Sequence, residues 1–228
     1  MNTNGDLVFH ENITSGIPSD LESMIIDLLT VDVFHPQTKE ELQTAVDMWV
    51  DDNANALATY SGINSWDVSL ITDMSEIFRD KNMFNDDISD WDVSNVTNMA
   101  LMFAECHEFN QDLSNWDMSN ATNLHAMFLN ATSFNQDLSS WDVSNVTDMA
   151  VLFASAHAFN QDLSNWDVTN AVNMSATFQD AITFNFDINS WDVSNVVARD
   201  AMFQNATSFN QDLSSWDVSN VAAMNAMF

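Results

Sequence analysis

Aspartates recur along the chain at a constant spacing, and clustered carboxylates are ligands that suit hard cations. One set comes directly after a tryptophan each time: Asp67, Asp92, Asp117, Asp142, Asp167, Asp192 and Asp217. A second set follows an asparagine by two residues: Asp87, Asp112, Asp137, Asp162, Asp187 and Asp212. If the repeats stack in register, each set forms a row of carboxylates about 4.8 Å apart. Such rows favour the binding of a divalent cation, with Ca²⁺ as the candidate and the first set as its ligands.

The same aspartates also have a structural interpretation, which is the preferred one. Two carboxylates at that distance repel by about 0.9 kcal/mol in water, so a long row needs an offsetting interaction. Serine, or threonine at one position, lies two residues after every aspartate of the first set and is placed to donate a hydrogen bond. The second set is typical of turns fixed by side-chain-to-backbone bonds. Residues 51–55 begin like an EF-hand loop but lack its glycine and distal glutamate.

Catalysis finds little support in the pattern. Cys106 and His107 are adjacent, but the equivalent positions of other repeats hold unrelated residues. An acidic setting also raises the pKa of a thiol and makes it less reactive. Paired carboxylates serve glycoside hydrolysis, yet the evenly repeated aspartates single out no pair. We therefore predict that the protein is not an enzyme and requires no cofactor.

The elements that position these side chains follow from an internal repeat. Its anchor is a Trp-Asp pair every 25 residues without insertion, with the tryptophans at Trp66, Trp91, Trp116, Trp141, Trp166, Trp191 and Trp216. A phenylalanine keeps the same step from Phe78 to Phe228. A constant period is typical of stacked units that contact only their neighbours. We predict that the tryptophans form a structural ladder along the stack.

Each unit has room for one short strand and a return path. The Trp-Asp-Val step alternates apolar and polar residues, which predicts a strand with Trp and Val facing inward. Residues 121–128 space their apolar side chains by three and four, which predicts a short helical or 3₁₀ turn. We therefore predict an α/β repeat solenoid: a leucine-rich-repeat-like, right-handed coil with one short parallel strand and one short helical turn per unit.

The two ends of the chain differ from the repeats. Thr38 and Glu41 form a capping-box pattern, and Leu42, Ala45, Val46 and Trp49 share one helical face. We predict an N-terminal segment and helical cap over residues 1–62, in which 21–33 is a helix or a strand, and a solenoid of about seven repeats over 63–228. Because the sequence stops at Phe228 where a unit would continue, we expect a longer natural array.

The charge balance is strongly acidic, with 34 Asp and Glu against four Lys and Arg and a net charge of -30. This charge disfavours nucleic acid and anionic membranes as partners, and it favours cations and basic surfaces. No apolar run predicts membrane insertion, and no signal peptide is visible. Arg199 occupies a position that holds Met or Leu in the other repeats. A charge there is costly, so we expect local rearrangement, with Arg199 reaching an aspartate outside the core.

The units have the form F-N-Q-D-L-S-x-W-D-V-S-N-V-T-x-M…M-F over residues 63–228. This pattern closely resembles the BspA-type repeats of bacterial surface proteins, which also occur in mycoplasma surface lipoproteins of uncharacterised function. The resemblance implies a leucine-rich-repeat-like protein at the cell surface or outside the cell, with a role in adhesion and no catalytic residues. The pattern departs from leucine-rich repeats because its asparagine lies one residue early, for example at Asn95 and Asn120.

These observations favour a non-enzymatic surface scaffold that binds a protein or a glycan by its extended face. One alternative is a structural subunit that assembles end to end through its uncapped C-terminal coil. A lesser alternative is a Ca²⁺-dependent adhesion module.

Overall fold

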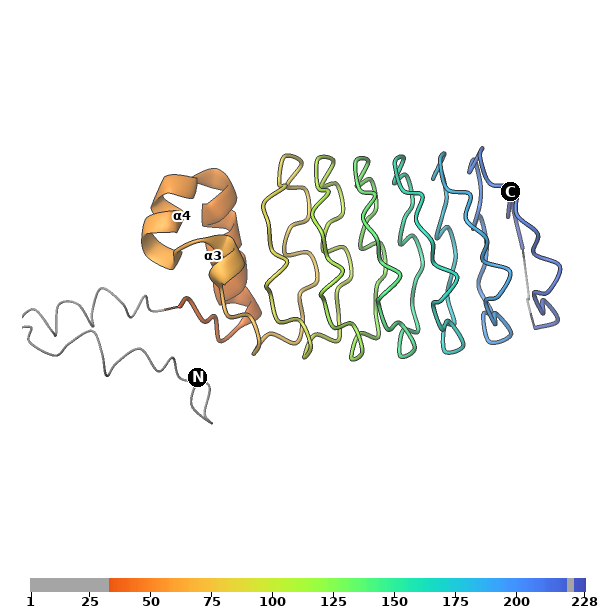
Figure 1. The fold of residues 1–228 in the computed structure, drawn as a ribbon, viewed down its shortest axis with the longest axis horizontal. Coiled ribbons are helices and arrows are strands. Elements are labelled where there is room, and N and C mark those ends of the chain that lie inside the picture. The colour runs from red at the N-terminus through yellow and green to blue at the C-terminus, as the bar shows by residue number, and fades with distance from the viewer. Residues whose placement is uncertain (1–32, 221–223) are drawn as a thin grey trace, which may run out of the picture. The chain divides into compact units, whose positions relative to one another are not determined.

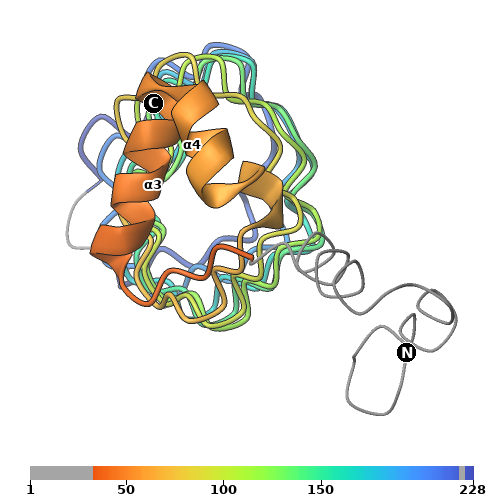
Figure 2. The same cartoon turned by 90° about the vertical axis from the view of Figure 1, so that its left-hand side faces the viewer.

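Two helices precede the repeats in the computed structural model, which describes residues 33–220 and 224–228. Helix α3 (Lys39–Asp51) and helix α4 (Asn53–Tyr60) are followed by a short 3₁₀ helix, η1 (Ile63–Ser65). Beyond η1 the chain runs through successive 25-residue coils that lie one behind another (Figure 1). Viewed along the stack, the coils superpose behind α3 and α4 (Figure 2). Residues 34–228 form one structural unit, and the prediction for residues 21–32 lies outside the described residues.

Helix α3 is the predicted helix, and its capping is confirmed. The Thr38 side chain accepts a hydrogen bond from the Glu41 N–H at 3.2 Å. The predicted apolar face of α3 is buried and belongs to the same apolar core as the coils. On its polar side, Lys39 Nζ lies 3.2 Å from an Asp73 carboxylate oxygen of the first coil. The start of the stack is therefore covered by an apolar helical face with ionic contacts at its edge.

The predicted leucine-rich-repeat-like α/β solenoid is wrong for the described residues. Between neighbouring coils the parallel pairing is limited to isolated one-residue bridges, such as Asn98 with Asn123 and Asn123 with Asp148. The described coils beyond η1 contain neither a strand nor a helix. The chain is instead a stack of irregular coils built largely from tight turns.

The hydrogen bonds of one coil explain why no strand forms. Alternate N–H groups reach the next coil: Met99 to Asn123 O, Leu101 to His125 O, Phe103 to Met127 O and Glu105 to Leu129 O, at 2.7–3.0 Å. The N–H groups between them close turns within the coil: Met102 to Met99 O, Ala104 to Leu101 O and Cys106 to Phe103 O, at 3.1–3.2 Å. Three of these seven donors therefore bond within their own coil, and a regular ladder cannot continue.

Left-handed backbone conformations prevent a helix in the same segment. Leu101 and Glu105 have φ values of 60° and 64°, and the equivalent residues of the other coils repeat this conformation. The set includes Val151 at φ 64°, although β-branched residues rarely adopt that region. A right-handed helix cannot pass through such residues. The apolar spacing of three and four that predicted a helical turn is produced here by consecutive tight turns.

Aromatic side chains stack in register through the core. The rings of Trp141, Trp166, Trp191 and Trp216 lie 6.3–6.5 Å apart, with planes within 4° of parallel. A phenylalanine column accompanies them, with Phe103 5.6 Å from Phe128 and 4.1 Å from Phe109. Trp and Val of the Trp-Asp-Val step both face inward, as expected; Trp66 is 2 % exposed and Val68 is fully buried. The repeat period therefore sets the register of the core, although it does not create strands.

From Trp91 onward, each ladder tryptophan also ties its coil to the preceding one by a polar bond. The indole N–H groups of Trp91, Trp116, Trp141, Trp166, Trp191 and Trp216 donate to main-chain oxygens of Ile63, Ile88, Leu113, Leu138, Leu163 and Ile188, at 2.8–3.2 Å. A buried indole N–H without a partner would be costly. The ladder therefore combines apolar burial with a directional bond that fixes the register of neighbouring coils.

Candidate functional site

The first aspartate set caps a turn in every coil. The Oδ1 atom of each member accepts a hydrogen bond from the backbone N–H two residues later, at 2.9–3.1 Å: Asp67, Asp92, Asp117, Asp142, Asp167, Asp192 and Asp217. Bonds from the Ser119 hydroxyl and N–H lower the pKa of Asp117. Thr169 and Ser194 lower the pKa of Asp167 and Asp192 in the same way. Asp117, Asp167 and Asp192 therefore stay ionised at neutral pH while they order the backbone.

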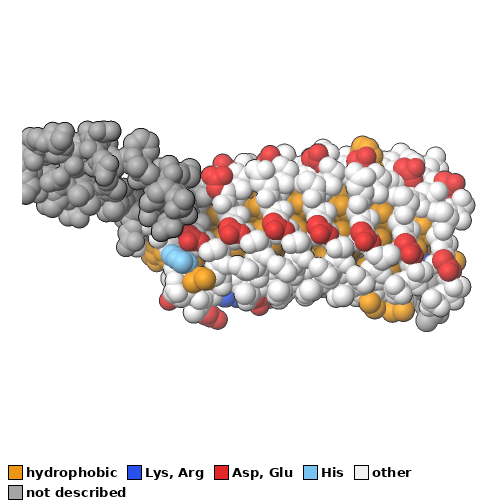
Figure 3. All heavy atoms as spheres, turned by 60° about the horizontal axis from the view of Figure 1, so that its bottom comes forward, with side chains coloured by type: hydrophobic (Ala, Val, Ile, Leu, Met, Phe, Trp, Pro, Cys, Tyr) orange, Lys and Arg blue, Asp and Glu red, His pale blue; other side chains and the backbone are white. Residues whose placement is uncertain are grey.

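The second set makes the same kind of turn elsewhere in the coil. Its members accept from the N–H two residues later, each at 2.9 Å: Asp87, Asp112, Asp137, Asp162, Asp187 and Asp212. Their acceptor role agrees with the structural interpretation of the sequence. Figure 3 shows acidic side chains in rows along the stack. Because every row member contributes one oxygen to its own turn, a row leaves one oxygen per coil for other contacts.

Cation binding by these rows stays a prediction. Among residues 33–220 and 224–228, no three or more His, Cys, Asp or Glu side chains come together in a group that could hold a metal ion. Ca²⁺ takes six to eight oxygen ligands. The stack separates the aspartates into successive coils and brings together no cluster of that size.

Acidification tests how much these turns contribute to stability. We expect the free energy of unfolding to fall below about pH 4, because carboxylates whose folded-state pKa is depressed stabilise the fold above their unfolded pKa and lose that effect as pH drops. Relief of charge repulsion acts in the opposite direction. Asp117→Asn keeps an acceptor oxygen but cannot titrate, so its stability should fall less between about pH 5 and about pH 2. Denaturant titrations at each pH measure this difference.

The control for acidification is Glu108→Gln, which removes an exposed carboxylate outside both sets. Between about pH 5 and about pH 2, its free energy of unfolding should fall by as much as that of the unaltered protein. If the free energy of unfolding falls equally in Asp117→Asn and in the unaltered protein, the capping bond of Asp117 contributes nothing to the pH dependence of stability.

Two asparagine ladders were not assigned a role from the sequence. The side-chain NH₂ groups of Asn95, Asn120, Asn145, Asn170, Asn195 and Asn220 donate to main-chain oxygens of the preceding coil, at 2.7–3.1 Å. In the other ladder, Asn85 Oδ1 accepts from the Asn110 N–H at 2.9 Å, and Asn110 Oδ1 accepts from Asn135 in turn. The sequence feature that could have predicted these ladders is the recurrence of the asparagines every 25 residues. Both ladders are structural, because their polar atoms are used between coils.

Arg199 lies inside the core and does not reach an aspartate carboxylate, so that expectation is wrong. Its side chain is fully buried, and Nη2 donates to the main-chain oxygens of Val193, Val196 and Asp217 at 2.5, 3.0 and 3.4 Å. Nε and Nη1 have no hydrogen-bond partner among the described residues. Loss of hydration in the core lowers the pKa of this guanidinium. We therefore expect this buried guanidinium to destabilise its coil.

Cys106 is buried, and its thiol donates to the main-chain oxygen of Phe78 at 2.9 Å. Burial raises the pKa of the thiol to about 12. Neighbouring His107 turns toward Glu105, with Nε2 3.2 Å from a carboxylate oxygen. His125 lies 3.9 Å from Asp148. The cysteine is therefore protonated at neutral pH and is a core residue.

The repeat units match one family model, over residues 47–158 and 137–228. That model describes a Mycoplasma protein of unknown function, DUF285. The chain belongs to this family. No curated protein matches the chain. In this DUF285 member, no helix among the described residues is long and apolar enough to cross a bilayer. The description of the family assigns no activity to its members.

Proposed function

We propose that the protein is a non-enzymatic scaffold, displayed at the cell surface or outside the cell, that binds a basic protein along its acidic rows. The family match and the resemblance to BspA-type surface repeats support the location. The observation that carries the proposal is the pair of aspartate rows, whose members are exposed in nearly every coil. End-to-end assembly and Ca²⁺-dependent adhesion stay alternatives, and a glycan is disfavoured as partner because most glycans carry no positive charge.

Apart from His35, whose Nδ1 atom lies 3.7 Å from an Asp67 carboxylate oxygen at the first coil, no Lys, Arg or His side chain of the described residues forms an ion pair with the acidic rows. Lys39 pairs with Asp73, Arg79 with Glu76, and Lys81 with Asp47. The remaining basic residue, Arg199, is buried. Beyond the first coil, the negative field of the rows is therefore left uncompensated among the described residues, and it steers basic surfaces toward the rows. A stack of coils that repeat the same aspartates every 25 residues would present this field at a regular spacing to an extended partner.

The proposal predicts that position matters as well as net charge. Poly-lysine binding should be measured by calorimetry at low and at physiological salt. A triple variant, Asp117→Asn, Asp142→Asn and Asp167→Asn, removes three adjacent charges from the first row while keeping each acceptor oxygen. We expect its affinity to fall by about tenfold at low salt, and by less as salt screens the charges.

The matched control is the triple variant Glu40→Gln, Asp51→Asn and Glu108→Gln, which has the same net charge but leaves both rows intact. Its affinity for poly-lysine should change by less than about threefold. Equal losses in the two triple variants would show that only the net charge matters, and that result would overturn the proposed binding face.

A further inference from the structure

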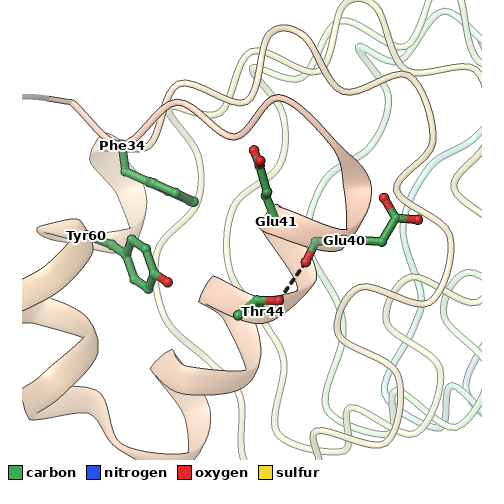
Figure 4. A pocket seen from close by; sticks show the side chains of 5 residues that line it. All are labelled: Phe34, Glu40, Glu41, Thr44 and Tyr60. Atoms are coloured by element: carbon green, nitrogen blue, oxygen red, sulfur yellow. Dashed lines mark hydrogen bonds between the residues drawn. The ribbon is translucent and has the colours of Figure 1, made fainter.

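A pocket of about 260 Å³ lies between the chain before α3, the first turns of α3 and the end of α4. Its lining residues are Phe34, Glu40, Glu41, Thr44 and Tyr60 (Figure 4). None of its lining residues belongs to the aspartate rows or to the repeat, although the Phe34 main-chain oxygen accepts a hydrogen bond from the Asp67 N–H at 3.0 Å. Nothing in the proposed scaffold function uses it.

Two aromatic rings form one wall of this pocket. The Phe34 and Tyr60 rings have centroids 4.4 Å apart and planes inclined at 51°. Both rings also contact Trp66, with centroid distances of 5.2 and 6.0 Å. Because Trp66 is almost fully buried in the first coil, it holds the two rings in place. The pocket therefore has an aromatic wall that is already formed.

A carboxylate stands on the other side of the pocket. The Glu41 Oε2 atom accepts a hydrogen bond from the Gln37 N–H at 2.7 Å, which restrains the side chain. In Figure 4 the Glu41 side chain rises opposite the Phe34 ring, whereas the Glu40 carboxylate is directed away from both rings. The Thr44 hydroxyl donates to the Glu40 main-chain oxygen at 2.7 Å, so it is occupied within the helix.

These groups are complementary to a cation with an apolar coat. Aromatic faces attract ammonium groups through the ring quadrupole, and carboxylates add a direct Coulomb attraction. The partial positive charge at the start of α3, about half a unit, is outweighed by two glutamates in its first turn. A Ca²⁺ ion would need six or more oxygen ligands, which an aromatic wall cannot supply.

We propose that this pocket binds an organic ammonium group, with Phe34 and Tyr60 contacting its apolar surface and Glu41 balancing its charge. The group can come from a small quaternary ammonium compound or from a lysine side chain of a protein partner. The two sources share the recognised chemistry and differ in the size and hydration of the charged head. The proposal is independent of the acidic rows, so the failure of either leaves the other standing.

The test uses the full chain and a single resonance. Tyr60 is the one tyrosine of the sequence, so ring-labelled tyrosine gives an unambiguous nuclear magnetic resonance signal in the pocket wall. Choline and N-acetyl-lysine amide are titrated separately, and the better binder identifies the source of the ammonium group. We expect saturable shifts of the Tyr60 ring signals. The neutral isostere dimethylbutanol, in which carbon replaces the charged nitrogen, should give none.

Two glutamate variants give the matched comparison. Glu41→Gln retains the acceptor for the Gln37 N–H and removes the charge, and we expect about three- to tenfold weaker binding. Glu40→Gln removes the same charge one residue away and should weaken binding by less than about twofold.

Phe34→Leu tests the aromatic wall. Once an unchanged melting temperature shows that this variant is folded, its affinity for the ammonium probe should be about three- to fivefold lower, because one ring face is missing.

Three outcomes would overturn the proposal. Equal shifts with dimethylbutanol would mean that the pocket takes any apolar molecule. Equal losses in Glu40→Gln and Glu41→Gln would mean that only the general acidity of α3 matters. Linear, unsaturated shifts with both ammonium probes would mean that the pocket holds no ammonium site.

Discussion

Replacing Arg199 with methionine is expected to raise the free energy of unfolding by about 2–4 kcal/mol. Methionine occupies the equivalent position in several other coils, at Met99, Met149 and Met174, where it is almost fully buried. The substitution removes a buried guanidinium whose Nε and Nη1 atoms lack partners among the described residues. Each unpaired buried donor costs about 1–3 kcal/mol. The three carbonyl contacts of Nη2 offset only part of that cost.

Thr177→Met is the matched control for the Arg199 substitution. Thr177 also occupies a core position that holds Met or Leu in neighbouring coils, but its hydroxyl lies 2.8 Å from the Met174 oxygen and 3.1 Å from the Met149 oxygen. Since this polar group is satisfied, we expect its replacement to change stability by less than about 1 kcal/mol. Denaturant unfolding and hydrogen exchange of residues 193–220 should be compared. A gain at Arg199 no larger than that at Thr177 would contradict the argument.

The sequence predicted which side chains are buried more successfully than it predicted secondary structure. Spacing alone placed Trp91 and Val93 inside, and both are buried. The strand and the helical turn were wrong because turns can repeat the same apolar spacing. The decisive feature is the left-handed backbone at residues such as Leu101 and Val151. Glycine usually marks that conformation, and here the register of the stack imposes it on other residues.

The predicted interactions of polar side chains were correct where the partners are close in the sequence and wrong where they are distant. The turns of the aspartate sets follow from residues two apart, and they were predictable. The environment of Arg199 depends on carbonyls up to 18 residues away, whereas the pattern of the repeat had predicted an aspartate outside the core as its partner. The ammonium pocket was missed because its rings, Phe34 and Tyr60, flank the two helices. The available signal was a pair of aromatic residues at the two ends of the helical segment, with adjacent glutamates in the first turn of α3.

Trp166→Ala is expected to cost about 3–5 kcal/mol, the range for deleting a large buried aromatic side chain. Trp166 stacks between Trp141 and Trp191, at 6.4 and 6.3 Å, and its indole N–H donates to the Leu138 oxygen at 2.9 Å. The substitution therefore removes stacking on both sides and leaves a buried carbonyl without its donor. Trp166→Phe keeps an aromatic ring and should cost about 1–3 kcal/mol, chiefly through the unpaired carbonyl.

Trp216→Ala separates the effect of stacking from that of residue type. Trp216 has the same indole bond, to Ile188, but among the described residues it stacks on one tryptophan only, Trp191. We therefore expect its replacement to cost about half as much as that of Trp166, measured by denaturant unfolding of each variant. Stacked units transmit a local loss to their neighbours, so hydrogen exchange should also rise in the coils on both sides of Trp166. Equal costs at the two positions would mean that each tryptophan stabilises only its own coil, and the in-register aromatic column would then not be what holds successive repeats together.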